Sequence, residues 1–336
     1  RFSTQHYQFI VKPDVIRILP KLVWHYNEPF GDSSMVPTFY VAQETRRHIT
    51  VALNGDGGDE NLAGYPRYQQ TKILERLFRV YSRVPEPWRQ AVFKSFLKLY
   101  GRWPGNTFFR AWKWLEETEK YGFDYAYSRR LLAFSDGHKA PLYSEWMKER
   151  IAEGEVRRLA RDIWQRAGQI DLLEKMMFSD FNLYLPEVLT VKMDIATMAN
   201  SLEARSPFLD HKLIETIACF PPEVKMCRGI SKYILKRKLK DFLPDEILTR
   251  KKMGFGLPVG YWFQNELKGY LRETLLSPEA EKRPYFNQAY LRQIIQEHTS
   301  GKVNHTTRLW CLLNLEVWHR LFIDSGGALS GQGPAG

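Results

Sequence analysis

The sequence has few cysteines and no long apolar run. Cys219, Cys227 and Cys311 are an odd number without the paired spacing of a zinc site, which favours a reducing compartment over a disulfide-stapled secreted fold. The longest apolar runs are far shorter than the roughly 18 residues that span a bilayer. The first residues, RFSTQHYQF, lack the apolar core of a signal peptide. These absences predict a cytoplasmic protein with no membrane partner.

The length and hydrophobic content of the chain predict a folded protein, and its charged residues are mostly basic. The 336 residues are 44% hydrophobic, enough to bury a core in one large or two modest domains. The net charge of +11 raises the alternative of an RNA-modifying enzyme, because a basic face neutralises phosphates. However, Lys232, Lys236 and Lys240 recur every four residues, which is typical of one solvated helix face. Without an aromatic-rich RNA signature or zinc spacing, a nucleic-acid partner is the weaker hypothesis.

The order of the predicted elements indicates an α/β protein with a parallel sheet, followed by a long helical part. The apolar patterns predict strands at 8–11 and 48–53 and helices at 14–25 and 35–47. Helical spacing continues further along the chain, at 72–84, 87–100, 171–184 and 289–297. We therefore expect a partial nucleotide-binding α/β core over 1–68, a mainly helical part over 69–324 and a disordered tail over 325–336.

The segment from His48 to Tyr68, HITVALNGDGGDENLAGYPRY, combines a strand with a loop of glycines and acids. The glycines of this loop have no Cβ, so the backbone can approach a phosphate and turn several N–H groups toward it. Its acids need a cation beside a polyphosphate, and Mg²⁺ is usually bound by one or two carboxylates plus phosphate oxygens. A calcium loop fails on spacing. The open alternative is an ordinary strand-to-helix turn, because Gly, Asn and Asp are favoured in turns.

Five segments together resemble the asparagine synthetase family of amidotransferases. The loop is similar to the family's SGxGxDExxxGY pattern, read here from Asn54 to Tyr65. Four further segments match in the family's order, at 27–38, 191–211, 232–252 and 254–258. The resemblance extends to about Phe263. It implies an adenine-nucleotide-hydrolase-like core of the ATP pyrophosphatase type, incomplete here, with active-site segments at 191–211 and 232–258 in the helical C-terminal part.

The resemblance implies an ATP-dependent amidation of aspartate to asparagine. The side-chain carboxylate of aspartate attacks the α-phosphate of ATP and pyrophosphate leaves; ammonia then attacks the β-aspartyl-adenylate and AMP leaves. In the family's pattern Asp59 matches the residue that holds Mg²⁺ against the pyrophosphate, and Lys252 matches the cation that stabilises it. Asp56 matches an acid that orients the reacting centre or accepts a proton from the amine. The expected nucleotide contacts are Asn54, Gly55, Gly57 and Gly58.

Two other segments could meet the substrate. Asp32, Ser33 and Ser34 precede a helix expected near Met35, so they could bind an anion or the amino-acid substrate, or one serine could simply cap the helix. The 191–211 segment is predicted to begin as a helix and to end in a turn at Ser206 and Pro207. There Glu203 and Arg205 could form an orienting ion pair, and Lys192 and Asp194 could contact substrate or pair locally.

The chain also departs from the family's pattern. No SGGxDS pyrophosphate loop precedes Asn54, and the leading cysteine of the amino-terminal glutaminase is absent. We therefore expect a piece of a longer protein that is inactive alone, with ammonia supplied by a missing glutaminase domain. A sister amidotransferase acting on another carboxylate, in polysaccharide or peptide modification, and a non-catalytic fragment are the alternatives. A homodimer is one oligomeric state open to the chain.

Overall fold

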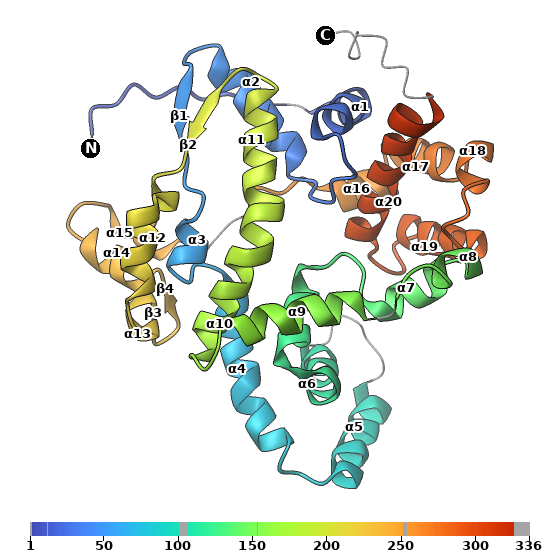
Figure 1. The fold of residues 1–336 in the computed structure, drawn as a ribbon, viewed down its shortest axis with the longest axis horizontal. Coiled ribbons are helices and arrows are strands. Elements are labelled where there is room, and N and C mark those ends of the chain that lie inside the picture. Colours follow the sequence, from blue (N-terminus) through green and yellow to red (C-terminus); the bar gives the residue numbers. More distant parts are fainter. Residues whose placement is uncertain (1, 12, 101–106, 153, 251–253, 326–336) are drawn as a thin grey trace.

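The structure is a computed structural model that describes residues 2–11, 13–100, 107–152, 154–250 and 254–325. Helices make up most of this part of the chain, and its β-structure is limited to four short strands (Figure 1). No helix among these residues is long and apolar enough to cross a membrane. The three cysteines are free thiols. The tail predicted to be disordered lies almost wholly outside the described residues, from 326 onward.

The first helices begin and end close to where the sequence predicts them. Helix α1 spans Val15–Tyr26 and helix α2 spans Met35–Arg46. Asp14 caps α1, because its Oδ1 accepts a hydrogen bond from the Arg17 backbone N–H at 3.1 Å. The strand predicted at 8–11 is wrong: these residues have no regular structure and Ile10 is 85% exposed. An apolar run forms a strand only where a neighbouring strand pairs with it, and no described strand pairs here.

Two short strands from distant parts of the chain form a parallel pair. Strand β1, Val51–Leu53, pairs with β2, Glu203–Arg205, with Val51 opposite Glu203 and Leu53 opposite Arg205. The prediction of a helix-rich α/β protein with a parallel sheet is thus confirmed in this coarse form. Strand β2 was not predicted. A second, antiparallel pair joins β3, Met226–Cys227, to β4, Ile230–Ser231.

The remaining elements are helices, many of them short. Between β1 and β2 lie α3 (Gly58–Asn61), α4 (Pro66–Tyr81), α5 (Glu86–Tyr100), α6 (Thr107–Ser128), η1 (Arg129–Leu131), α7 (Asp136–Leu142), α8 (Glu145–Lys148), α9 (Glu155–Arg166), α10 (Leu172–Ser179), the π-helix η2 (Asp180–Thr190) and α11 (Val191–Met198). After β2 come η3 (Pro207–Leu209), α12 (His211–Ala218), α13 (Pro222–Lys225), α14 (Tyr233–Lys238), α15 (Asp245–Thr249), α16 (Val259–Gln264), α17 (Lys268–Leu275), α18 (Pro278–Glu281), α19 (Gln288–Thr299), α20 (Thr306–His319) and the π-helix η4 (Arg320–Asp324). The four helical stretches predicted beyond residue 69 fall on α4, α5, α10 with η2, and α19.

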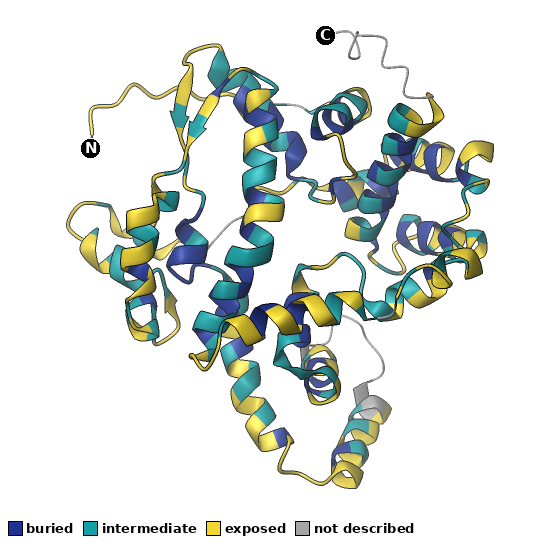
Figure 2. Cartoon of the chain, in the orientation of Figure 1, coloured by how far each residue is buried: buried dark blue, intermediate teal, exposed yellow. Residues whose placement is uncertain are grey.

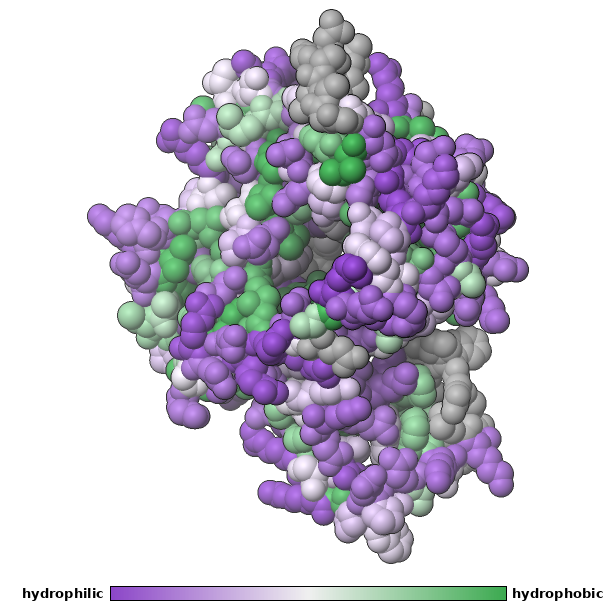
Figure 3. Space-filling view, turned by 45° about the vertical axis from the view of Figure 1, so that its right-hand side comes forward, coloured by the Kyte–Doolittle hydropathy of each residue, from purple (hydrophilic) through white to green (hydrophobic). Residues whose placement is uncertain are grey.

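Buried side chains form three clusters, and the largest joins the two ends of the chain. It packs α1 and α2 against α16, α17, α19 and α20, with Trp310 and Phe263 fully buried (Figure 2). A second cluster, around Tyr68, Tyr127 and Met176, packs α4 against α6, α9 and α10. A third packs Tyr81 of α4 against the tryptophans of α6. On the face that Figure 3 shows, apolar residues gather mainly on the left-hand side.

Candidate functional site

The loop after β1 is held by the turn after β2. The Asn54 N–H donates to the Arg205 carbonyl at 2.9 Å, which continues the β1–β2 ladder by one residue. The Asn54 side-chain Oδ1 accepts from the Ser206 hydroxyl at 2.5 Å and from the Asp56 N–H at 3.1 Å. Asn54 thereby fixes where the loop leaves the strand. Its amide side chain has a structural role that its place in the sequence did not reveal.

The fold requires glycine at 57, packs Gly58 tightly and places no constraint on Gly55. Gly57 has φ +85° and precedes α3, and a Cβ there would lie 2.2 Å from Leu209 Cδ2. A Cβ on Gly58 would lie 3.3 Å from the Phe208 ring. A Cβ on Gly55 would meet nothing within 4 Å. Gly55 is therefore the loop glycine at which the protein leaves open space for a ligand.

Asp59 forms an ion pair with a lysine from the far part of the chain. Lys232 Nζ lies 2.9 Å from Asp59 Oδ1, and the side chains are 28% and 13% exposed. Lys232 has φ +53° and its N–H donates to the Leu62 carbonyl at 2.9 Å. A Cβ on Gly64 would lie 1.9 Å from Asp59 Oδ1 and 2.4 Å from Lys232 Cε, so only glycine leaves room for the pair. The prediction that Lys232 belongs to a solvated helix face is wrong, because its ammonium turns inward to Asp59.

A cavity of about 690 Å³ opens beside this pair. Asp59, Lys232, Lys236 and Arg250 supply its charged lining, and leucines of α14 and α15 with the segment between them supply most of its apolar lining. Lys252, predicted to contact pyrophosphate, is outside the described residues, which stop at Arg250 and resume at Gly254. Arg250 shows that the chain just before Lys252 borders the cavity that Asp59 lines.

A buried ionic network holds the segment that follows the Asp59 loop. Asp180 of η2 is fully buried, and its Oδ2 accepts from Arg67 Nη2 at 2.8 Å, from the Tyr127 hydroxyl at 2.8 Å and from the Tyr68 hydroxyl. The Arg67 guanidinium also lies 3.7 Å from the centre of the Tyr65 ring. These contacts lock the start of α4, which follows the Asp59 loop, onto η2.

Glu60, the neighbour of Asp59, points into the protein interior. Its side chain accepts a hydrogen bond from the Tyr65 hydroxyl, and the residue is only 1% exposed. Burial raises the pKa of Glu60 above its ordinary value. Glu60 thus belongs to the support of the loop rather than to its open face.

Asp32, Ser34 and Lys192 form a second polar cluster. Asp32 accepts from the Ser34 N–H at 2.9 Å and from the Ser34 hydroxyl at 2.7 Å. Lys192 Nζ donates to the Ser34 hydroxyl at 2.9 Å and lies 3.4 Å from Asp32 Oδ2. Ser34 stands at the start of α2 but its side chain does not cap the helix, so that alternative is wrong for Ser34. Ser33 contributes its carbonyl, which accepts from the Val36 N–H at 3.3 Å.

Tyr184 of η2 lies between the two polar clusters. Its ring centre is 5.9 Å from that of Tyr65. Burial, together with the charges of Asp32, Glu60 and Asp180 and against that of Arg67, raises the pKa of the Tyr184 hydroxyl to about 12. The charges of Asp32 and Glu60 therefore act on the same side chain.

Comparison with known proteins gives the chain its relatives. Residues 1–320 match the asparagine synthase family. The chain belongs to the asparagine synthase family. It is 30% identical over 322 residues to asparagine synthetase [glutamine-hydrolyzing] 1 of Bacillus subtilis, covering 91% of this chain and 46% of the relative. It is 29% identical over 325 residues to a putative asparagine synthetase [glutamine-hydrolyzing] of Mycobacterium bovis, covering 96% of this chain and 47% of that protein. The chain thus spans about half the length of these relatives.

With a single carboxylate, the Asp59 site fits a magnesium ion that takes most of its ligands from outside the protein. Among the described residues, no group of three or more His, Cys, Asp or Glu side chains could hold a metal by itself. Asp59 offers one carboxylate beside an ammonium at the edge of a cavity. That arrangement suits an ion that takes one or two protein carboxylates and completes its shell with phosphate oxygens and water.

Three residues of the predicted active-site segments have partners that the sequence prediction did not name. Ser206 was expected only as part of a turn, yet it binds Asn54. Lys232 was assigned to a solvated face, and its position beside Asp59 depends on packing that no local pattern encodes. Lys192 was left open between a substrate contact and local pairing, and it joins Asp32 and Ser34. The Glu203–Arg205 pair does form, at 2.7 Å between two exposed side chains.

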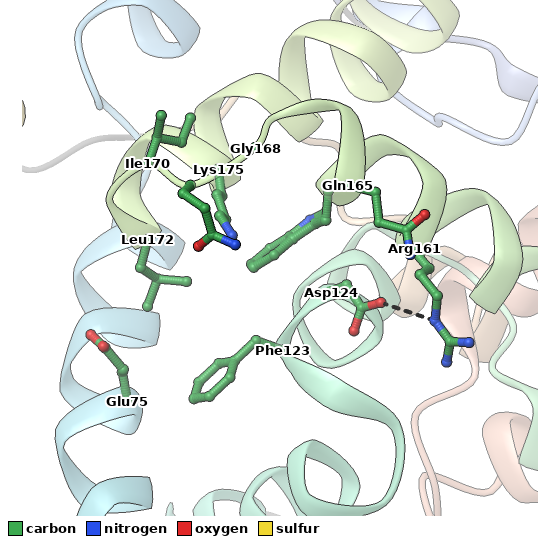
Figure 4. Close-up of a pocket in the computed structure, with 11 residues that line it drawn as sticks. Glu75, Phe123, Asp124, Arg161, Gln165, Gly168, Ile170, Leu172 and Lys175 are labelled. Carbon is green, nitrogen blue, oxygen red and sulfur yellow. Dashed lines mark ion pairs between the residues drawn. The ribbon is translucent and has the colours of Figure 1, made fainter.

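A further cavity of about 600 Å³ lies between α4, α6, α9 and α10 (Figure 4). Phe123 lies on its lower side in that view, and an ion pair of 3.9 Å joins Arg161 to Asp124 at its edge. None of the residues predicted for the asparagine synthase site is among the described residues that line it. This cavity is therefore distinct from the candidate site.

Proposed function

We propose that this chain is the synthetase part of an enzyme that amidates aspartate to asparagine at the expense of ATP. The aspartate side-chain carboxylate attacks the α-phosphate of ATP, and the bond to pyrophosphate breaks. Ammonia then attacks the acyl carbon of the β-aspartyl-adenylate, loses a proton and displaces AMP. The observation that carries the proposal is the meeting of Asp59, Lys232 and Arg250 around one cavity, in a member of the asparagine synthase family.

The proposed nucleotide site uses both charges beside the cavity. Asp59 would bind Mg²⁺, which when bound neutralises phosphate charge and orients the pyrophosphate leaving group. Lys252 would stabilise the charge that develops on pyrophosphate, and Lys232 stands close enough to Asp59 to assist it. Backbone groups of Asn54, Gly55, Gly57 and Gly58 would contact the nucleotide, where Gly55 leaves open space.

The proposed acceptor side of the site uses Asp56 and the Asp32 cluster. Asp56 follows Gly55 in the loop, where it would orient the reacting carbonyl or take the proton from the incoming amine. Asp32, Ser33 and Ser34 would border aspartate. The Lys192 ammonium holds Asp32 and Ser34 in one geometry, so these groups are ordered before substrate arrives.

Several finer points complete the proposal. The β1–β2 pair would be part of an ATP pyrophosphatase-type sheet within residues 1–68 and the later active-site segments. Ammonia would come from glutamine through a glutaminase domain that these 336 residues do not contain, and the chain alone would form little asparagine. The protein would work in the cytoplasm, and a homodimer is its proposed assembly.

Aspartate-dependent exchange of labelled pyrophosphate into ATP tests the first step. The assay compares the 336-residue chain with the longest natural form of the protein, and screens aspartate against other carboxylates. Exchange that depends on aspartate and Mg²⁺ in the longer form supports the proposal. Exchange with a different carboxylate would assign the chain to a sister amidotransferase, and an inactive longer form would favour a non-catalytic role. Robust asparagine formation from ammonia by the 336 residues alone would refute the proposed inactivity.

A further inference from the structure

Among the described residues that line a cavity of about 680 Å³ beside the start of α20, all the charged side chains are positive. Its lining includes Arg110, Arg129 and Arg308 together with His138 and His305, and the described lining residues include no carboxylate. Hydroxyls and an amide of the neighbouring loops complete the polar surface. In Figure 1, α7, α19 and α20 stand on the right and the α3 and α14 region on the left, so this cavity is separate from the candidate nucleotide site.

The Arg308 guanidinium donates its hydrogen bonds to uncharged groups. Its Nε and Nη2 donate to His305 Nδ1 at 3.1 and 2.8 Å, its Nη1 pairs with His138 Nε2 at 2.9 Å, and its Nη2 also donates to the Asn304 carbonyl at 3.1 Å. No carboxylate of the described residues forms an ion pair with it. The guanidinium is half-buried, and burial lowers its pKa. A half-buried cation without an anionic partner is costly, and an anion would remove that cost.

The two histidines accept from Arg308 because they are neutral. Burial, followed by the charge of Arg308, lowers the pKa of His138 to about 4. Burial also lowers the pKa of His305, against the hydrogen bond of 2.8 Å that its Nε2–H donates to Glu297 Oε2. The His305 ring thus lies between Arg308 and the Glu297 carboxylate, whose charge still acts on Arg308. The cluster keeps the guanidinium in one orientation without supplying a charge at the cavity surface.

The other two arginines leave the positive charge in excess. Arg129 Nε lies 2.8 Å from Glu117 Oε2, so its charge is matched by a carboxylate outside the lining. Arg110 is exposed at the rim. Together with Arg308 they surround a space whose volume falls within the range of small-molecule sites.

We propose that this cavity binds a phosphate-bearing anion, with Arg308 and Arg110 as its main cationic contacts. Most guanidinium N–H groups of Arg308 already donate to the protein, so Arg308 offers a ligand its charge and one Nη1 N–H. The exposed Arg110 adds its planar set of donors, and a phosphate has more oxygens than a carboxylate with which to contact both arginines. The free ion and a phosphate ester share this chemistry, and the cavity volume leaves room for the rest of a small phosphorylated metabolite. The proposal does not depend on the reaction catalysed elsewhere in the chain.

Calorimetric titration with inorganic phosphate and with glycerol 3-phosphate, at fixed ionic strength, tests the proposal. We expect saturable binding that weakens about tenfold in Arg308→Gln and in Arg110→Gln, because each loses a charge-assisted hydrogen bond. Arg110 is exposed, so its substitution gives a result even if Arg308→Gln fails to fold. Arg161→Gln, which removes an arginine at another cavity, should bind phosphate as the parent does.

The histidine resonances give a second readout. Ligand should shift the NMR signals of His138 and His305, which border the cavity. Tighter binding of the ester would assign the cavity to a phosphorylated metabolite, and equal binding to the free ion. No saturable binding of either probe, or unchanged affinity in both arginine variants, would overturn the proposal.

Discussion

Lys232 Nζ and Asp59 Oδ1 lie 2.9 Å apart, and Gly64 packs against both with no room for a Cβ. The carboxylate proposed to bind Mg²⁺ is thus held by a cation until a nucleotide arrives. Magnesium and phosphates would have to share or replace this ammonium. Two substitutions therefore test the pair separately. One removes the charge of the Asp59 carboxylate, and the other fills the space that Gly64 leaves beside it.

Asp59→Asn should abolish adenylation while sparing the fold. The amide keeps the size of the side chain but removes the charge that Mg²⁺ needs, so pyrophosphate exchange in the longest natural form should fall at least about 100-fold. Thermal unfolding should change little. The matched control is Asp162→Asn, an exposed acid of α9. Exchange that survives in Asp59→Asn would remove this residue from the proposed metal site.

Gly64→Ala should push Asp59 and Lys232 apart. The added Cβ would overlap Asp59 Oδ1 at 1.9 Å and Lys232 Cε at 2.4 Å. We expect the free energy of unfolding to fall by about 1–2 kcal/mol in urea titrations, since two mobile side chains can give way at moderate cost. Gly55→Ala is the control and should stay within about 0.5 kcal/mol, because its Cβ enters open space. Equal stabilities of the two variants would contradict the packing described.

Arg67→Met should destabilise the fold strongly. It would leave the fully buried Asp180 carboxylate with only the tyrosine hydroxyls as donors, which should cost about 3–5 kcal/mol of unfolding free energy. Lys72→Met is the control, because the Lys72–Asp171 pair is more exposed and 3.5 Å long and should contribute less than about 1 kcal/mol. Chemical denaturation of both variants at neutral pH gives the comparison. Similar losses would mean that the Arg67 network carries little stability.

His138 should make stability fall as the pH drops. Its pKa is about 4 in the folded chain and 6.5 ordinarily, so between these values the unfolded chain binds a proton that the folded chain does not. The contribution is complete above pH 6.5 and is lost progressively down to about pH 4. Because solvent screens this half-buried ring, we expect roughly 1–2 kcal/mol.

Denaturation of His138→Gln and its parent at pH 7.5 and pH 4.5 measures this contribution. The difference in unfolding free energy between the two pH values should be smaller in the variant by that amount. His6→Gln, at an exposed position, should keep the parent's pH dependence. A His138→Gln variant with the parent's full pH dependence would refute the assignment.

Local patterns predicted several of the helices but only part of the site. Helices α1 and α2 were placed to within one or two residues, because capping and apolar spacing act within the segment itself. Strand β2 was missed because Glu203, Ala204 and Arg205 carry no strand signal and are held by β1 alone. The strand predicted at 8–11 shows the reverse error, an apolar run without a partner.

The same distinction divides the site residues. Asn54, Gly57 and Asp59 could be singled out because their types and spacing stand together in one loop. Ser206, Lys192 and Lys232 lie in other elements, within segments that the family's pattern singled out, but no local pattern indicated which residues they would contact. Only the folded arrangement gives them partners.

The short β1–β2 pair also dictates when the site can form. Asn54 and Ser206 lie 152 residues apart in the sequence, and most of the described residues between them are helical, so the entropy of closing that loop opposes their hydrogen bond. Helices with local contacts form early, and such distant pairings form late. During refolding the helical parts should gain protection from hydrogen exchange before the amides of β1 do. The candidate site is therefore among the last regions of the molecule to be assembled.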